Sequence, residues 1–429
     1  MKEKYISQIS LIINATIFIG VGITLILIPT TSANLFHLIV SMLISFLGII
    51  SLIFNLIKTK NKINIIISTS TFLIGLFFFS KPTTFLSLFP VIFGFYMLIN
   101  GIVKLLVYVI YKEQKLKGYH PTLLSSLIDF GFSFVMIFYP SKNIKILTII
   151  LGIYLILFGL TYVYDFLKDL FPKVFSHSRR RIRITLPIFI SALIPYRVYT
   201  KINDALDKYV TPVHINKKTI NNAVDLEIFV HVKNTAIGSI GHIDLCFENK
   251  VYSYGCYDES SKRLFETLGD GVFFSINSKT KYLKFCTSHS KKTIFCFGIT
   301  LTDKQKLKIK KELEKIKEHS YRWYCKQETD DTQEHDDYAS ILYKHTNARF
   351  HKFSKGKWKK YFLFSNNCVK LVDKVLGATG TDILQINGLI TPGAYYNYLN
   401  KEFKRKNSNV IKKDIYTNIK EKKHQKDFL

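Results

Sequence analysis

Two residues far apart in the chain have the types and local settings that thiol catalysis requires. Cys368 follows the strand-like segment 360–365 and stands in the first turn of a predicted helix that runs to about Leu376. The free N–H groups and dipole of a helix start favour a thiolate, the nucleophilic form of cysteine. His242 opens a predicted strand directly after Gly241, a rigid position for a general base. The pair predicts nucleophilic attack on a carbonyl group, with proton transfer by the histidine.

An oxyanion hole and a third polar residue would complete such a site. The backbone N–H of Cys368 and a neighbouring asparagine side chain could stabilise an oxyanion, and of Asn366 and Asn367 we take Asn367. For the group that orients His242, three candidates stay open: Ser253, Tyr254 and Asp244.

The competing interpretation of Cys368 is a small buried residue in an ordinary helix, which is the commonest role of cysteine. Its place after a strand and the "NNC" turn favour catalysis. Four other cysteines lie inside strand patterns and are expected in the core: Cys246, Cys256, Cys286 and Cys296. We expect His231 to be structural as well. None of the six cysteines forms a CxxC pair, so we expect no metal site and no cofactor.

The elements that would position these residues indicate an α+β fold. Six segments have strand composition: 224–232, 242–247, 250–257, 271–276, 281–287 and 293–301. The second and third form a predicted hairpin across Glu248 and Asn249. A helix capped by Thr302 is predicted from about Asp303 to Tyr324, followed by an acidic loop over 326–340. A short helix is predicted over 391–399.

"GHIDLCFENKVYSYG" followed about 110 residues later by "FLFSNNCVKLVDKVLGATG" resembles the circularly permuted papain-like hydrolases. These include permuted NlpC-type enzymes, lecithin:retinol acyltransferase-like proteins and PPPDE deubiquitinase-like domains. The resemblance covers residues 220–400. It implies a thiol protease, amidase or acyltransferase with His242 as base and Cys368 as nucleophile.

The first 170 residues have a different character, because six apolar runs are long enough to cross a membrane. The runs are 5–29, 35–57, 62–80, 84–110, 121–139 and 144–167. The first is too long for the core of a cleavable signal, so we expect it to be retained. Lys104 and Asp129 are the charged exceptions within the runs, and Asp165 lies near an end.

The six runs form three copies of one hairpin. A proline ends the first helix of each pair, at Pro29, Pro82 and Pro140. Small residues stand in register around these prolines: Gly22, Gly75 and Ser133, then Ser41, Gly94 and Gly152, then Gly48, Gly101 and Gly159. Small residues seven apart let helix backbones approach closely in lipid. The pattern resembles the HdeD-like bacterial membrane proteins, which implies six helices in repeated hairpins and an association with acid stress.

Loop charges predict the orientation. Lys and Arg are frequent before the first run and after the second, fourth and sixth runs, which all lie on one side of the membrane, and are rarer in the loops on the other side. Because cytoplasmic loops carry the excess of positive charge, both termini are predicted to be cytoplasmic. The cysteines are then expected to be free thiols. Residues 401–429 have ten Lys and Arg against four acidic residues, which suits anionic lipid, and no recognition motif supports nucleic-acid binding. We divide the chain into a transmembrane domain (1–172), a basic connector that docks at the membrane surface (173–205), a papain-like domain (206–402) and a solvated basic tail (403–429).

The expected protein is therefore a multi-pass bacterial cell-membrane protein whose cytoplasmic domain is a cysteine hydrolase or acyltransferase. Its partners would be the lipid bilayer and a protein, peptide or lipid acyl substrate. Two alternatives remain: a non-catalytic interaction module on the same fold, attached to a stress-response membrane protein, and a transporter with a regulatory tail. The sequence leaves the substrate and the oligomeric state open.

Overall fold

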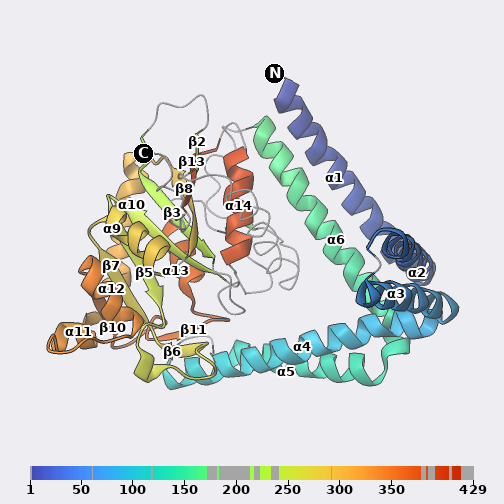
Figure 1. The fold of residues 1–429 in the computed structure, drawn as a ribbon, viewed down its shortest axis with the longest axis horizontal. Helices are drawn as coiled ribbons and strands as arrows, with labels where there is room; N and C mark the ends of the chain where they lie inside the picture. The colour runs from blue at the N-terminus through green and yellow to red at the C-terminus, as the bar shows by residue number, and fades with distance from the viewer. Residues whose placement is uncertain are drawn as a thin grey trace. The chain divides into compact units, whose positions relative to one another are not determined.

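The computed structural model describes two units, Met1–Leu170 and Phe171–Leu429 (Figure 1). The described residues are 2–59, 61–116, 119–171, 181–182, 213–216, 223–232, 241–290, 292–377, 383–384, 392–404 and 408–416. The predicted boundary at residue 172 lies close to the division between the two units.

Six helices make up the first unit: α1 (Lys2–Leu27), α2 (Pro29–Phe54), α3 (Lys62–Ser80), α4 (Pro82–Glu113), α5 (Tyr119–Phe138) and α6 (Pro140–Leu170). A π-helical turn, η1 (Asn55–Thr59), extends α2. Each of the six helices is long and apolar enough to span a membrane, so this prediction is confirmed. Many of their large apolar side chains face outward, as lipid-facing helices require.

The three prolines lie at equivalent turns, since Pro29, Pro82 and Pro140 are each the first residue of a helix. Proline fits there because the first N–H of a helix has no intrahelical partner. The closest packing, however, is between hairpins: α1 with α6, α2 with α3 and α4 with α5. The second helix of each hairpin therefore packs against the first helix of the next, and the third hairpin returns to the first.

Glycines make these contacts possible, and they do so in register. Each glycine nineteen residues after a proline faces a residue ten before a proline: Gly48 faces Phe72, Gly101 faces Phe130 and Gly159 faces Ile19. A Cβ on these glycines would lie 2.6 to 2.9 Å from the facing residue. The repeated small residues thus act as packing positions, as the sequence predicted.

Polar groups differ between the helix pairs. Between α4 and α5, Lys104 Nζ lies 2.6 Å from Asp129 Oδ2, which also accepts a hydrogen bond from Asn100 Nδ2 at 2.7 Å. Between α2 and α3, the hydroxyls of Ser51 and Ser68 hydrogen bond at 2.8 Å. The charged pair is therefore neutralised within its own helix pair, where an isolated charge in lipid would be costly.

The second unit is built on one nine-stranded sheet, in which all neighbours are antiparallel. Its order is β2 (Val213–Asn216), β13 (Val410–Tyr416), β8 (Thr293–Ile299), β3 (Leu226–Val232), β4 (His242–Phe247), β5 (Lys250–Gly255), β7 (Val272–Ile276), β10 (Arg349–Phe353) and β9 (Ser320–Trp323). Two short pairs lie outside it: β6 (Leu268–Asp270) with β11 (Lys360–Phe362), and β1 (Arg181–Ile182) with β12 (Ile383–Leu384).

Helices cover both faces of this sheet. The longer ones are α10 (Asp303–Lys317), α13 (Cys368–Gly377) and α14 (Pro392–Lys404), whose buried residues join one apolar core with Ile228 and Leu245. The helices α9 (Lys279–Lys284) and α12 (Tyr338–Thr346) pack in the second core with Phe229. Three short turns complete the unit: η3 (Glu259–Ser261), η4 (Phe285–His289) and α11 (Lys326–Thr329).

Two predictions for the middle of this unit are wrong. Residues 281–287 were expected as a strand but form α9 and η4, because Ser278 caps a helix there and Tyr282, Leu283 and Cys286 bury one helical face. The capped helix begins as predicted, with a capping box at Thr302, but ends at Lys317.

Segments expected as helix end, loop or tail also contain regular structure. Residues 320–323 form β9, and the loop predicted over 326–340 holds α11 and the start of α12. The expectation of a solvated tail over 403–429 is wrong for Val410–Tyr416, which forms β13 within the sheet because its apolar residues are buried against β8. The predicted membrane docking of the connector lies outside the described residues, apart from the two residues of β1.

Candidate active site

Cys368 is the first residue of α13, as the sequence predicted. The helix is capped by Asn367, whose Oδ1 accepts a hydrogen bond from Lys370 N at 3.0 Å. Its Nδ2 donates to the carbonyl oxygen of Leu363 at 2.8 Å. The asparagine thus ties the preceding loop to the helix start and fixes where the thiol emerges.

His242 is the first residue of β4, also as predicted. The backbone at position 241, just before it, can accommodate only glycine. Gly241 has φ +81°, and a Cβ there would lie 2.8 Å from the carbonyl oxygen of His231. The β4–β5 hairpin turns at Glu248 and Asn249, with φ of 51° and 60°. This matches the predicted hairpin and sets His242 at the end of β4 away from that turn.

The imidazole of His242 is surrounded by polar groups. Its Nε2 lies 2.8 Å from Asp244 Oδ1 and 3.0 Å from both Ser253 Oγ and Tyr257 Oη. The thiol of Cys368 is close enough to this ring to interact with it electrostatically. The structure therefore brings the two predicted site residues together.

The surroundings of His242 favour its charged form. Burial by itself lowers the pKa of this imidazole, but the charges of Asp244 and of a Cys368 thiolate outweigh burial and raise the pKa to about 10. His242 is then an imidazolium at neutral pH when Cys368 is a thiolate. Its side chain remains 21 % exposed, so the ring borders solvent.

Asp244 is fully buried and lies between two histidines. Its Oδ2 is 2.8 Å from His231 Nε2 and accepts a hydrogen bond from the hydroxyl of Tyr282. Burial would raise the pKa of this carboxyl, but His242 and then His231 hold it well below its usual range. Burial lowers the pKa of His231 to about 4, so His231 is neutral while Asp244 is charged.

Of the three candidates for the orienting group, Asp244 and Ser253 contact His242 and Tyr254 does not. Tyr254 points into the core, where its hydroxyl donates to the carbonyl oxygen of Trp358 at 3.0 Å. Cys246, Cys286 and Cys296 are buried as expected, and Cys256 is partly buried. All six cysteines are free.

Sequence reasoning missed four residues of this site: His231, Tyr257, Tyr282 and Tyr361. His231 stands directly opposite His242 in the β3–β4 register. The sequence could have indicated its position, because strand alternation in "VDLEIFVHV" puts His231 on the same face as Glu227 and Phe229. The tyrosines come from separate elements and have no such signal.

Tyr361, on β11, is close enough to Cys368 for the two side chains to interact electrostatically. Burial and then the nearby Cys368 raise the pKa of Tyr361 well above its usual range, so its hydroxyl stays protonated. The oxyanion role predicted for Asn367 stays a prediction, and both ends of that side-chain amide already have partners.

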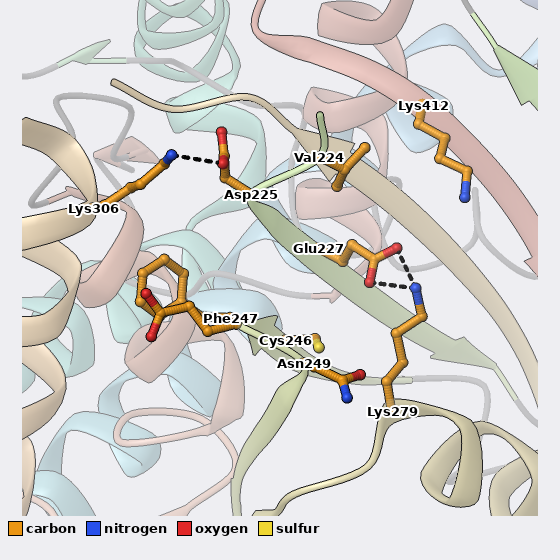
Figure 2. A pocket seen from close by; sticks show the side chains of 10 residues that line it. Val224, Asp225, Glu227, Cys246, Phe247, Asn249, Lys279, Lys306 and Lys412 are labelled. Carbon is orange, nitrogen blue, oxygen red and sulfur yellow. Dashed lines mark hydrogen bonds and ion pairs between the residues drawn. The ribbon is translucent and has the colours of Figure 1, made fainter. Parts of the chain in front are cut away.

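A cavity of about 420 Å³ lies near the β4–β5 turn, at the other end of β4 from His242 (Figure 2). Most of the charged residues that line the cavity form ion pairs with one another. Lys279 lies 2.6 Å from Glu227, and Lys306 lies 2.9 Å from Asp225. Cys246 also lines the cavity, but burial raises the pKa of its thiol, which makes it a poor nucleophile.

One group beside this cavity has the spacing of metal ligands. Glu227, Cys296 and Asp414 are buried and offer ligand atoms within 4.8 Å of one another. However, Lys279 pairs with Glu227 at 2.6 Å and Lys412 with Asp414 at 2.7 Å. Two ammonium groups already neutralise the carboxylates, so a cation would have to displace them.

Comparison with known families bears on the first unit. Residues 66–138 match the family described as a short repeat of unknown function (DUF308). The match runs from within α3 through α4 to the end of α5, so it includes Gly75, Pro82, Gly94 and Gly101, the repeated small and proline positions of the second hairpin. With the six apolar helices, it fits the HdeD-like resemblance and supports a multi-pass membrane protein. No curated protein and no solved structure matches the chain.

Proposed function

We propose that the second unit is a membrane-tethered cysteine hydrolase or acyltransferase that acts on an amide or ester bond. One observation carries the proposal: His242 contacts the buried carboxylate of Asp244 at 2.8 Å and is close enough to the thiol of Cys368 to interact with it. A nucleophile, a base and a group that orients the base are the parts that covalent acyl transfer needs.

In the proposed reaction, His242 takes the thiol proton and the Cys368 sulfur attacks the carbonyl carbon. The tetrahedral intermediate collapses when the carbon–nitrogen or carbon–oxygen bond breaks, and the imidazolium gives its proton to the leaving amine or alcohol. The acyl group is then a thioester on Cys368. Water or an acceptor alcohol or amine, deprotonated by His242, attacks the thioester and restores the thiol.

Neighbouring groups have separate proposed roles. Asp244 stabilises the imidazolium, and Ser253 and Tyr257 hold the ring in place through Nε2. The backbone N–H of Cys368 and the hydroxyl of Tyr361 are proposed as donors to the oxyanion. Asn367 would act through the helix cap, which sets the direction of the thiol.

A permuted papain-like fold is part of the same proposal. Its support is local: a histidine opens one strand of a hairpin, and a cysteine later in the chain opens a helix that packs on that hairpin. The loop charges support a cytoplasmic location for this unit. Such a location favours protein amide bonds, isopeptides or lipid acyl groups over cell-wall peptides as substrates.

The burial of Cys368 favours a second candidate, a non-catalytic interaction module. Cys368 is only 2 % exposed, which is typical of a structural cysteine. A thiol that binds no substrate would still form the observed contact with His242.

A thiol-reactive acyl probe separates the two candidates. The full-length protein is treated with an acyloxymethyl ketone, and the labelled residue is identified by peptide mass. The enzyme hypothesis expects labelling at Cys368, loss of labelling in Cys368→Ala and at least tenfold slower labelling in His242→Ala. Cys256→Ala is the matched control, because Cys256 is the more exposed thiol. Equal labelling of wild type and His242→Ala would favour the interaction module.

A further inference from the structure

The loop between η3 and β6 has an unusual backbone. Leu264, Phe265 and Glu266 all have left-handed conformations, with φ of 49°, 54° and 65°. A bridge between Arg263 and Leu268 closes the loop below them. Three consecutive left-handed residues without a glycine are strained, and strain of this kind concentrates at functional positions.

The strained residues display apolar side chains to solvent. Phe265 is 91 % exposed and Leu264 is 48 % exposed. Beside them, the amide of Leu363 donates to the carbonyl oxygen of Thr267 at 2.8 Å, which brings the 38 % exposed Phe364 to the same end of the β6–β11 pair. We call Leu264, Phe265 and Phe364 the apolar tip.

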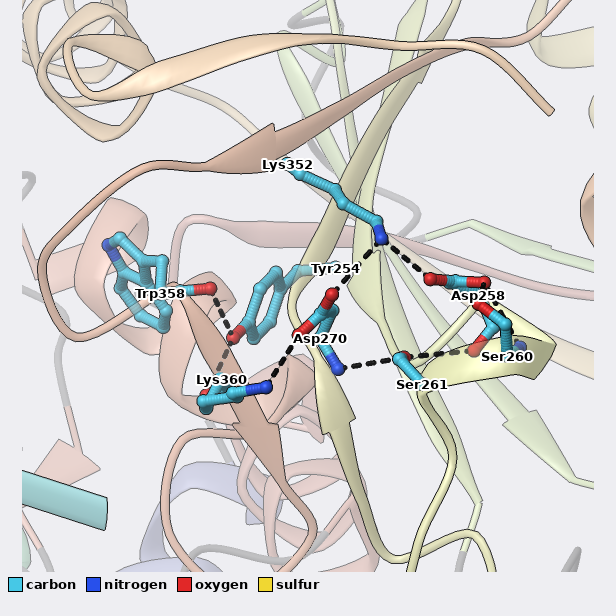
Figure 3. Close-up of polar contacts among 8 residues, drawn as sticks. All are labelled: Tyr254, Asp258, Ser260, Ser261, Asp270, Lys352, Trp358 and Lys360. Atoms are coloured by element: carbon cyan, nitrogen blue, oxygen red, sulfur yellow. Dashed lines mark hydrogen bonds and ion pairs between the residues drawn. The ribbon is translucent and has the colours of Figure 1, made fainter. Parts of the chain in front are cut away.

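A network of charges holds the base of the loop rigid (Figure 3). Lys352 Nζ bonds Asp258 at 2.6 Å and Asp270 at 3.0 Å. Lys360 Nζ lies 2.7 Å from the other oxygen of Asp270, whose backbone N–H donates to Ser261 Oγ at 2.9 Å. The apolar tip is therefore presented by a stiff support.

We propose that the apolar tip inserts into the surface of the lipid bilayer. Single exposed apolar residues are common, but two on a strained loop with a fixed base, and a third beside them, need a partner. The occupant is lipid, because the same chain carries six helices able to span a membrane and so keeps this unit beside a bilayer. Aromatic and aliphatic tips with adjacent cations suit the interface.

The charge next to the tip agrees with this partner. Arg263 directly precedes Leu264, and among the residues that the structure describes it forms no ion pair. If Leu264 and Phe265 enter the acyl region, the adjacent guanidinium of Arg263 would lie at the level of the lipid phosphates. The proposal goes beyond the proposed catalysis and does not depend on it.

Insertion would also bring the candidate active site to the membrane. In the β6–β11 pair, Tyr361 lies opposite Gly269, one residue from the loop end of the pair. The same Tyr361 lies close enough to Cys368 to interact with it. The tip and the thiol are thus joined through a single strand.

Quenching of tryptophan by brominated lipid tests the proposal in the full-length protein. Both native tryptophans, Trp323 and Trp358, lie in the second unit, so the membrane helices contribute no background. Phe265→Trp is reconstituted in nanodiscs of phosphatidylcholine and phosphatidylglycerol, with and without bromine on the acyl chains. After subtraction of the parent signal, we expect the added emission to be blue-shifted and at least halved by bromine.

Leu307→Trp is the matched control, since Leu307 is 60 % exposed on α10. Quenching of Trp at 265 no stronger than at 307 would overturn the proposal. A blue shift without quenching would also overturn it and would indicate a protein partner or a second copy. If the 265 variant does not fold, Phe364→Trp tests the same tip. Acyl-probe labelling of Cys368 in the same nanodiscs reports catalysis separately, so the two proposals fail independently.

Discussion

Replacing His231 with glutamine should make the second unit less sensitive to acid. His231 is 1 % exposed, and burial lowers its pKa from the ordinary 6.5 to about 4. Its Nε2 faces Asp244 at 2.8 Å, a contact that a glutamine amide can replace. In the unfolded chain the same imidazole takes up a proton near pH 6.5, so protonation pulls the equilibrium toward unfolding.

The sign and size follow from this depressed pKa. The contribution of neutral His231 is complete above pH 6.5 and is lost as the pH falls toward 4. At 1.36 kcal/mol per pKa unit, the loss is about 2 kcal/mol at pH 5 and about 3 kcal/mol below pH 4. The raised pKa of His242 works in the opposite direction, but its stabilisation is lost as pH rises from 6.5 to about 10. The pKa of Asp244 is lowered, so its contribution to the free energy of unfolding is lost only as the pH falls below the ordinary value of 3.8.

Between pH 6.5 and pH 4.5 the comparison of wild type with His231→Gln isolates His231, because His345 and His351, whose pKa values are also lowered, titrate in both proteins. Unfolding in guanidinium is followed by the fluorescence of Trp323 and Trp358, with the full-length protein in detergent micelles. Wild type should lose about 2 kcal/mol more than His231→Gln across this window. Parallel losses in the two proteins would refute the reasoning, because His231 would then not be held neutral by burial.

Three further predictions concern the thiol, the helix packing and the topology. Cys368 should react with iodoacetamide faster than the other five cysteines, and His242→Ala should slow that reaction, as measured by peptide mass. Gly22→Val should lower the thermal stability of the helical unit by about 1–3 kcal/mol, since a Cβ there would lie 2.7 Å from a backbone oxygen of α6. Gly20→Val is its control, because a Cβ at Gly20 meets nothing within 4 Å. A reporter active only outside the cytoplasm, fused after Leu429, should stay silent.

Each of these has a clear contrary result. Uniform alkylation of all cysteines would leave the thiol as a structural residue. Equal effects at the two glycines would mean that α1 and α6 do not pack as described. An active reporter would reverse the topology and make a cell-wall substrate the better proposal.

The sequence by itself determined which segments of the membrane unit form helices. In lipid, an apolar run of about twenty residues can satisfy its backbone hydrogen bonds internally only as a helix. Length and composition were therefore enough to predict six helices. The register of Pro29, Pro82 and Pro140 also predicted the turns. Which helices pack together was not predictable, because proximity in sequence suggested hairpins while the glycine contacts join α1 to α6.

In the second unit, local signals predicted local structure. Thr302 caps its helix and Cys368 starts another, because caps depend on a few adjacent residues. The strand predicted over 281–287 failed for a tertiary reason, since its apolar residues bury one face of a helix against the sheet. β13 was not predicted, because this basic segment forms a strand only when it can pair with β8 in the folded domain.

The candidate site divides in the same way. Cys368 and His242 stood out in the sequence because each begins an element, where a side chain has a distinctive setting. Their partners did not, because Tyr257, Tyr282 and Tyr361 reach the site from three separate elements. Only the tertiary structure decides that Asp244 lies between His231 and His242, since a buried carboxylate is tolerable only where folding supplies cations and donors around it.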